Sequence, residues 1–205
     1  MNLKNDDYTV AWICALPLEV AAANAMVDEV HASPPERLGS DQNAYTLGRV
    51  CNHNVVIACL PFGVYGTTSA TAVLSRLQAT FPRLSFALMV GVGGGVPNNN
   101  QGVDLRLGDV VVSTPSAISS GVIQYDYGKA VDGHLLPTGV LNKPPGFLLT
   151  AVSKLESNAL LGTRPVPALI SKVLEDNPDL KSQFSRPDDD WQFYSACRHR
   201  KSIAS

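Results

Sequence analysis

Blocks of apolar residues, separated by polar and glycine-containing segments, dominate the first half of the chain. The first block, residues 8–16, is rich in strand-forming side chains and predicts a strand. Pro17 and Glu19 follow directly and suit the first turn of a helix, and the alanine-rich stretch up to Val30 continues it. The chain therefore opens with a strand, a tight turn and a helix.

The same pattern predicts further strands and helices along the chain. An apolar run bounded by turn residues indicates a strand, and a longer stretch of helix-forming residues after a turn indicates a helix. The predicted strands cover 44–50, 54–60, 86–92, 107–113 and 121–127, and the predicted helices cover 67–81, 147–161 and 168–175. The first two strands form a hairpin, and the uncharged run at 86–92 is expected to be covered on both faces. This order predicts an α/β domain around a mixed or mostly parallel sheet.

Composition narrows the class of protein. The chain has 205 residues, is 45% hydrophobic and carries a formal net charge of −2, which suits one domain with a sizeable core. Lys and Arg (16) do not outnumber Asp and Glu (18), so we expect no nucleic-acid partner. The start has no cationic-then-apolar leader, and no apolar run approaches the roughly 18–20 residues of a membrane span. We therefore expect a cytoplasmic protein without a membrane partner.

The four cysteines do not suggest a disulfide framework in a chain of this size. Cys-x-His pairs at 51–53 and 197–199 could supply four zinc ligands, but a gap of one residue is poor geometry for such a site. We therefore expect neither a metal nor a cofactor. Cys14 and Cys59 lie inside apolar runs and are interpreted as small buried hydrophobic residues.

A glycine-rich loop follows the apolar run at 86–92 and is the first candidate for chemistry. Glycines after a buried strand let the backbone approach a ligand closely. Val96 stands where the dinucleotide-binding fingerprint needs its third glycine, and no Gly-Lys-Ser/Thr motif is present. A glycine turn that serves packing alone explains the same residues.

Two further candidates precede predicted helices. Gly63 lies in the loop 62–66 ahead of the helix at Thr67, where free amide groups can hold an anion or a ribose hydroxyl, although the loop has no Lys or Arg. Glu19 follows the first strand at the carboxyl end of the predicted sheet, where open α/β folds bind ligands. Its carboxylate could activate a water as a general base. The alternative is a solvated glutamate that the helix dipole favours.

Together these segments resemble the nucleoside phosphorylase and nucleosidase superfamily. The segments that carry the resemblance are 13–20, 62–66, 91–96, 107–113 and 124–128. They are most similar to the fungal branch, whose domains often precede an NTPase or repeat module in immune-receptor-like proteins. The resemblance covers residues 8–130 well and continues loosely to about 185. It implies a three-layer α/β/α fold with a central mixed sheet.

The resemblance also implies roles for individual residues. Glu19 matches the glutamate that activates the attacking water in the nucleosidases. The residues matching the lining of the ribose and nucleophile site are Gly63, Gly91, Val92, Gly93, Gly94 and Gly95. The phosphorylases hold phosphate with an arginine and a serine where this chain has Met89 and Val92. Desolvating phosphate without these donors is costly, so the resemblance favours hydrolysis over phosphorolysis.

The family takes its ribose clamp and its leaving-group acid from the C-terminal portion, which nothing after Pro187 resembles. We therefore expect a nucleoside phosphorylase-like domain over 1–185 that lacks the last strands and helix, followed by a disordered polar tail over 186–205. Loss of a positioned acid typically costs about 10²–10⁴ in rate.

The leading hypothesis is a nucleosidase-like domain that cleaves the N-glycosidic bond of a purine nucleoside or nucleotide by water attack. One alternative is a catalytically inactive nucleoside-binding or self-association module of an immune-receptor-like protein. Another is a phosphate-dependent phosphorylase. The resemblance also leads us to expect a homo-oligomer.

Overall fold

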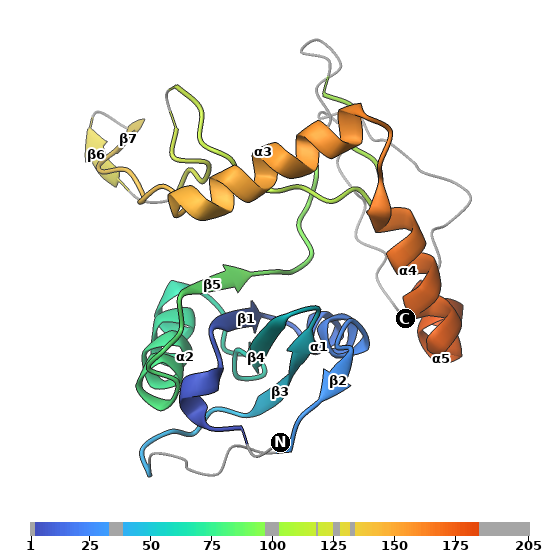
Figure 1. Ribbon diagram of the computed structural model, residues 1–205. Helices are drawn as coiled ribbons and strands as arrows, with labels where there is room; N and C mark the ends of the chain where they lie inside the picture. Colours follow the sequence, from blue (N-terminus) through green and yellow to red (C-terminus); the bar gives the residue numbers. More distant parts are fainter. Residues whose placement is uncertain are drawn as a thin grey trace, which may run out of the picture. The chain divides into compact units, whose positions relative to one another are not determined.

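The chain divides into two compact units, Met1–Gly95 and Val96–Ser205, in the computed structural model shown in Figure 1. The residues that the structure describes are 3–32, 39–96, 103–117, 119–124, 128–131 and 134–184. The tail predicted over 186–205 lies outside the described residues. The extent of the predicted domain, 1–185, stays a prediction.

A five-stranded mixed sheet with the order β2-β3-β4-β1-β5 forms the centre of the first unit. Its strands are β1 (Val10–Cys14), β2 (Glu29–Val30), β3 (Tyr45–Val50), β4 (His53–Cys59) and β5 (Phe86–Met89). β1 is parallel to both β4 and β5, whereas β3 is antiparallel to β4 and to β2. The predicted hairpin and the predicted α/β class with a mixed sheet are confirmed.

Helices cover both faces of this sheet (Figure 1). The helices of the first unit are α1 (Pro17–Ala25), α2 (Thr67–Thr80) and the short 3-10 helix η1 (Asn5–Asp7). Side chains of a strand point alternately to its two faces, so β1 contributes to two cores. Cys14 packs in one core with Ala23 of α1, and Ile13 packs in the other with Val73 of α2. The first unit therefore has three layers, helix on sheet on helix.

Two elements of the first unit are shorter than predicted. The first helix ends at Ala25, because Glu29 and Val30 pair with β3 instead of continuing the helix. β5 ends at Met89, and the expectation that both of its faces are covered is wrong. Its last three residues are exposed, and no described element covers them; β5 is also an edge strand that pairs with β1 on one side.

The second unit contains a hairpin and three helices. Its elements are β6 (Gly128–Val131), β7 (His134–Pro137), α3 (Gly146–Leu160), α4 (Pro165–Asp176) and α5 (Pro178–Phe184). β6 and β7 are antiparallel. The helices predicted over 147–161 and 168–175 are confirmed as α3 and α4. Of the strand predicted over 121–127, residues 121–124 form no strand and residues 125–127 lie outside the described part.

The strand predicted over 107–113 is wrong. A turn precedes the apolar residues, in which the N–H of Asp109 donates to the carbonyl oxygen of Arg106 over 3.1 Å. Val110 and Val111 are 72% and 73% exposed, and no described strand pairs with them. A strand needs a neighbour that accepts its backbone hydrogen bonds, so an apolar run alone was not sufficient to predict one.

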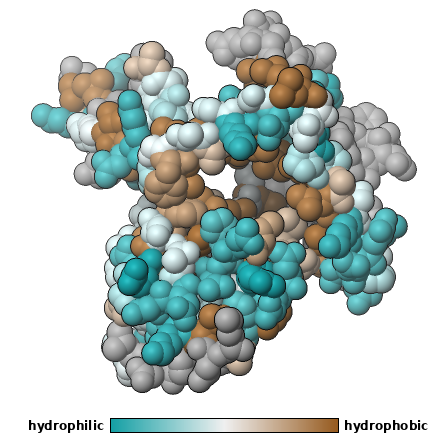
Figure 2. Space-filling view, in the orientation of Figure 1, coloured by the Kyte–Doolittle hydropathy of each residue, from teal (hydrophilic) through white to brown (hydrophobic). Residues whose placement is uncertain are grey.

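Apolar side chains of the second unit remain exposed, and Figure 2 shows hydrophobic surface over β6–β7 and α3. Leu136 in β7 is exposed, as are Leu155 and Leu160 in α3. None of the described residues of α3 or α4 is buried. The described part of this unit therefore leaves much of its apolar surface uncovered.

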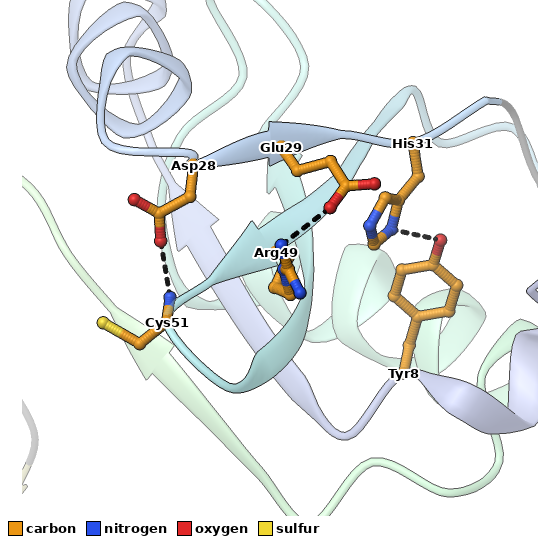
Figure 3. A network of polar contacts seen from close by, with 6 residues as sticks. All are labelled: Tyr8, Asp28, Glu29, His31, Arg49 and Cys51. Carbon is orange, nitrogen blue, oxygen red and sulfur yellow. Dashed lines mark hydrogen bonds and ion pairs between the residues drawn. The ribbon is translucent and has the colours of Figure 1, made fainter. Parts of the chain in front are cut away.

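A group of polar contacts holds the β2–β3 edge of the first unit (Figure 3). Arg49 and Glu29 pair across the two strands at 2.9 Å. Cys51, in the turn between β3 and β4, has a φ of 53°, and its N–H donates to Asp28 Oδ2 over 2.6 Å. Both residues of the ion pair are half-exposed, so that pair adds little to stability.

The buried carboxylate of Asp41, in the loop before β3, is hydrogen-bonded to the last residue of α2. Asp41 is 8% exposed, and its Oδ2 accepts hydrogen bonds from the Tyr45 hydroxyl at 2.7 Å and from Thr80 Oγ1 at 2.5 Å. Asn43 donates from its side chain to the carbonyl oxygen of Val73 in α2. Because buried polar groups are costly without partners, this network fixes α2 against the sheet.

Candidate functional site

Glu19 lies where β1 gives way to α1, and its carboxylate holds the turn between them. Oε2 accepts hydrogen bonds from the backbone N–H groups of Ala15 at 2.7 Å and Leu16 at 2.9 Å. Amides ahead of a helix have no partner within the helix, and a glutamate in the first turn can supply one. Glu19 is only 8% exposed. The solvated glutamate considered as the alternative is therefore ruled out.

The second carboxylate oxygen of Glu19 reaches the glycine-rich segment after β5. Oε1 accepts a hydrogen bond from the Val92 N–H at 2.9 Å. A Cβ at Gly91 would lie 2.6 Å from Cδ of Glu19, which is closer than packed atoms approach. The N–H of Val90 donates to the carbonyl oxygen of Ile13, which keeps this segment beside β1. A side chain at Gly91 would therefore force the Glu19 carboxylate or the backbone to shift.

The remaining predicted site residues make no described contact with Glu19. Gly63 has a φ of +77° in the loop before α2, and a Cβ there would meet open space. Gly93 and Gly94 also have nothing within 4 Å of an added Cβ, and Gly95 is exposed. Of the predicted lining residues, the structure places Gly91 and Val92 against Glu19.

The charge of Glu19 is set by two opposing effects. Burial raises its pKa, but the three backbone amides at Leu16, Val92 and Ala15 stabilise the anion and outweigh burial, so the pKa is lowered. A carboxylate offers about four acceptor positions, and the two amides on Oε2 and one on Oε1 leave a position on Oε1. Glu19 can therefore accept a hydrogen bond from a hydroxyl or a water, but it is a weak proton acceptor near neutral pH.

Two thiols, Cys14 and Cys59, lie close enough to this carboxylate to feel its charge, and this proximity was not predicted from the sequence. Burial raises the pKa of Cys14 to about 11, with the negative charge of Glu19 adding to the effect. Burial and the charge of Glu19 also raise the pKa of Cys59. The sequence carried a signal for this position, because each cysteine lies near the end of an apolar run, shortly before Pro17 or Pro61.

In the ranges that the structure describes, no three side chains of His, Cys, Asp or Glu gather in a way that could hold a metal ion. The Cys-x-His pair at 197–199 lies outside those ranges. Among the described helices, none combines the length and the hydrophobicity that crossing a membrane requires.

No family model and no solved structure matches this chain. The chain is 44% identical over 192 residues to a protein of Hyaloscypha variabilis named as a nucleotide-binding leucine-rich repeat (NLR)-like protein. The aligned residues make up 94% of this chain but 19% of the relative. The chain is therefore similar to one section, about a fifth of the length, of an NLR-like protein.

Proposed function

We propose that this chain is a nucleoside-binding module of an NLR-like protein, with Glu19 at the centre of its site. The observation that carries the proposal is the position of the Glu19 carboxylate, fixed by three backbone amides against Gly91 and Val92. The similarity to a section of an NLR-like protein supports the part of the proposal that assigns the module to such a protein.

The fixed carboxylate suits recognition of a sugar. Ribose hydroxyls are hydrogen-bond donors, and the remaining acceptor position on Glu19 Oε1 is oriented before any ligand arrives. A group that is already held in place loses little conformational entropy on binding. The preference for a purine base comes from the family resemblance alone.

One feature favours binding without turnover. The lowered pKa of Glu19 makes it a poor acceptor for the proton of an attacking water. We therefore expect the protein to retain its ligand rather than cleave it.

Isothermal titration calorimetry with adenosine, methylthioadenosine and ATP tests this proposal. We expect heat of binding from at least one of them, and loss of that heat in Glu19→Gln, whose amide nitrogen donates where an acceptor is needed. Gly39→Ala is the matched control, because Gly39 lies outside the predicted site and an added Cβ there meets nothing within 4 Å. Absence of binding to all three compounds would contradict the proposal.

Hydrolysis of the N-glycosidic bond is the second candidate function. The free acceptor position on Glu19 supports it, because an ionised carboxylate can orient a water even where it takes up a proton poorly. Chromatographic detection of free adenine in the same three mixtures distinguishes the two functions. Adenine release that is lost in Glu19→Gln would favour hydrolysis, and release that requires added phosphate would favour phosphorolysis.

A further inference from the structure

Cys14 and Cys59 are direct neighbours across the sheet. Each is the last residue of its strand, and the parallel register of β1 and β4 places the two opposite each other. Neighbouring strands lie about 4.8 Å apart. That separation falls within the range of about 4.4–6.8 Å between Cα atoms that a disulfide spans.

The two side chains also lie on the same face of the sheet. Both pack in the core on the α1 side, together with Ile57 and Ala23. A Cys59 thiolate would raise the pKa of the Cys14 thiol, so the two side chains are close enough to interact electrostatically. Cys51 shares neither the strand position nor the burial of these two cysteines. It is exposed and lies in the turn between β3 and β4.

The two thiols differ in their access to solvent. Cys14 is fully buried, whereas Cys59 is partly exposed at the carboxyl end of β4. A small oxidant therefore meets Cys59 first, and Cys14 is placed to react with the product. An accessible thiol beside a buried partner is the arrangement in which a sulfenic acid is converted to a disulfide, whereas the raised pKa of Cys59 makes the first oxidation step slow.

We propose that Cys14 and Cys59 form an oxidisable dithiol site that takes a hydroperoxide, such as hydrogen peroxide, as its two-electron oxidant. In the first step the small fraction of Cys59 that has lost its proton attacks one peroxide oxygen as the thiolate, the O–O bond breaks, and hydroxide leaves and takes up a proton to form water. Cys59 is then a sulfenic acid. In the second step the Cys14 sulfur attacks the Cys59 sulfur, the S–O bond breaks, and a second water leaves. The two thiols are oxidised to a disulfide and the peroxide is reduced to two waters.

The disulfide acts on the backbone that supports Glu19. Cys14 directly precedes Ala15, whose N–H donates to Glu19 Oε2. The carbonyl oxygen of Cys14 accepts a hydrogen bond from Leu60, the residue after Cys59. Oxidation therefore links the ends of β1 and β4 at the point where the Glu19 turn begins. This inference does not depend on the proposed nucleoside binding.

Peptide mapping of the intact chain after treatment with hydrogen peroxide tests the proposal. The reaction is stopped by denaturing the protein in excess N-ethylmaleimide, so that every remaining thiol is blocked before digestion. Trypsin places Cys14 on a peptide of residues 5–37 and both Cys51 and Cys59 on a peptide of residues 50–76. We expect these two peptides to be joined, with one N-ethylmaleimide on Cys51 and a mass otherwise lower by two hydrogen atoms than the sum of the two unmodified peptides.

Variants identify which cysteine forms the link. Cys51→Ser is the matched control and should give the same joined peptides, whereas Cys59→Ser and Cys14→Ser should give none. If Cys14→Ser does not fold, the joined peptides of Cys51→Ser still decide the matter, because Cys59 is then the sole cysteine on its peptide. The proposal is overturned if Cys51→Ser stays unlinked at peroxide doses that oxidise Cys51 in the unaltered chain. Linkage only after denaturation would overturn it as well.

Discussion

The Oε1 atom of Glu19 accepts a hydrogen bond from the backbone N–H of Val92 at 2.9 Å, although 73 positions separate the two residues in the chain. The contact joins the start of α1 to the segment that follows β5. Because β1 and β5 are parallel neighbours, their carboxyl ends meet at one edge of the sheet. The bond between Glu19 and Val92 therefore depends on this strand order.

Glu19→Gln should break the bond to Val92 and keep the turn at Ala15 and Leu16. The glutamine oxygen can still accept both turn amides, but its NH₂ group then faces the Val92 N–H. We expect faster hydrogen exchange at the Val92 amide and little change at Ala15 and Leu16, measured by amide exchange with residue resolution. Glu19→Ala, which removes every acceptor, should speed exchange at all three positions. Unchanged exchange at Val92 in both variants would show that the bond contributes nothing.

Gly91→Ala should destabilise the first unit. The added Cβ lies 2.6 Å from Glu19 Cδ, so either the carboxylate or the backbone must shift. Crowding of this kind typically costs about 1–3 kcal/mol, and a urea unfolding curve measures it. Gly93→Ala is the matched control, since its Cβ meets nothing within 4 Å. Equal stability of the two variants would contradict the close approach at Gly91.

Asp41→Ala should cost about 3 kcal/mol of unfolding free energy, because it removes the acceptor of the buried Thr80 hydroxyl and of the half-buried Tyr45 hydroxyl. Glu29→Ala provides the comparison, because it removes an exposed ion pair with Arg49 that is worth at most about 1 kcal/mol. Thermal or urea unfolding measures both. A loss in Asp41→Ala no larger than that in Glu29→Ala would argue against a stabilising role of the buried network.

The lowered pKa of Glu19 predicts an acid-dependent part of the stability. Glu19 binds a proton less readily in the folded chain than in the unfolded chain, whose pKa is near 4.5. Its contribution is therefore complete above that value and is lost as the pH falls through the folded-state pKa. Urea unfolding between neutral and acidic pH should show a smaller loss of stability in Glu19→Gln than in the unaltered chain. Identical pH profiles would contradict the shift.

Most strands and helices of the first unit could be predicted from the sequence. The contacts between residues that are distant in the chain could be predicted only in part. The hairpin after residue 44 was predictable because its two apolar runs flank a short turn. The proximity of Glu19 to Gly91 was suggested by their common position after a strand. The register of Cys14 with Cys59 was not predictable, because it depends on the alignment of β1 with β4 rather than on either strand alone.

The second unit was harder to predict from the sequence. The helices α3 and α4 were found because each has a long run of helix-forming residues. The strand predicted over 107–113 failed because the apolar pattern does not say whether a neighbouring strand is present. The family resemblance rested partly on that segment, and so the resemblance stays a prediction.

The most direct test of a nucleoside site at Glu19 is to follow the backbone amide NMR signals of Ala15, Leu16 and Val92 while adenosine is added. A nucleoside site at Glu19 should give saturable shifts at these three amides in the unaltered chain and none in Glu19→Gln. Binding of adenosine that leaves all three signals unmoved would place the site elsewhere and overturn the proposal.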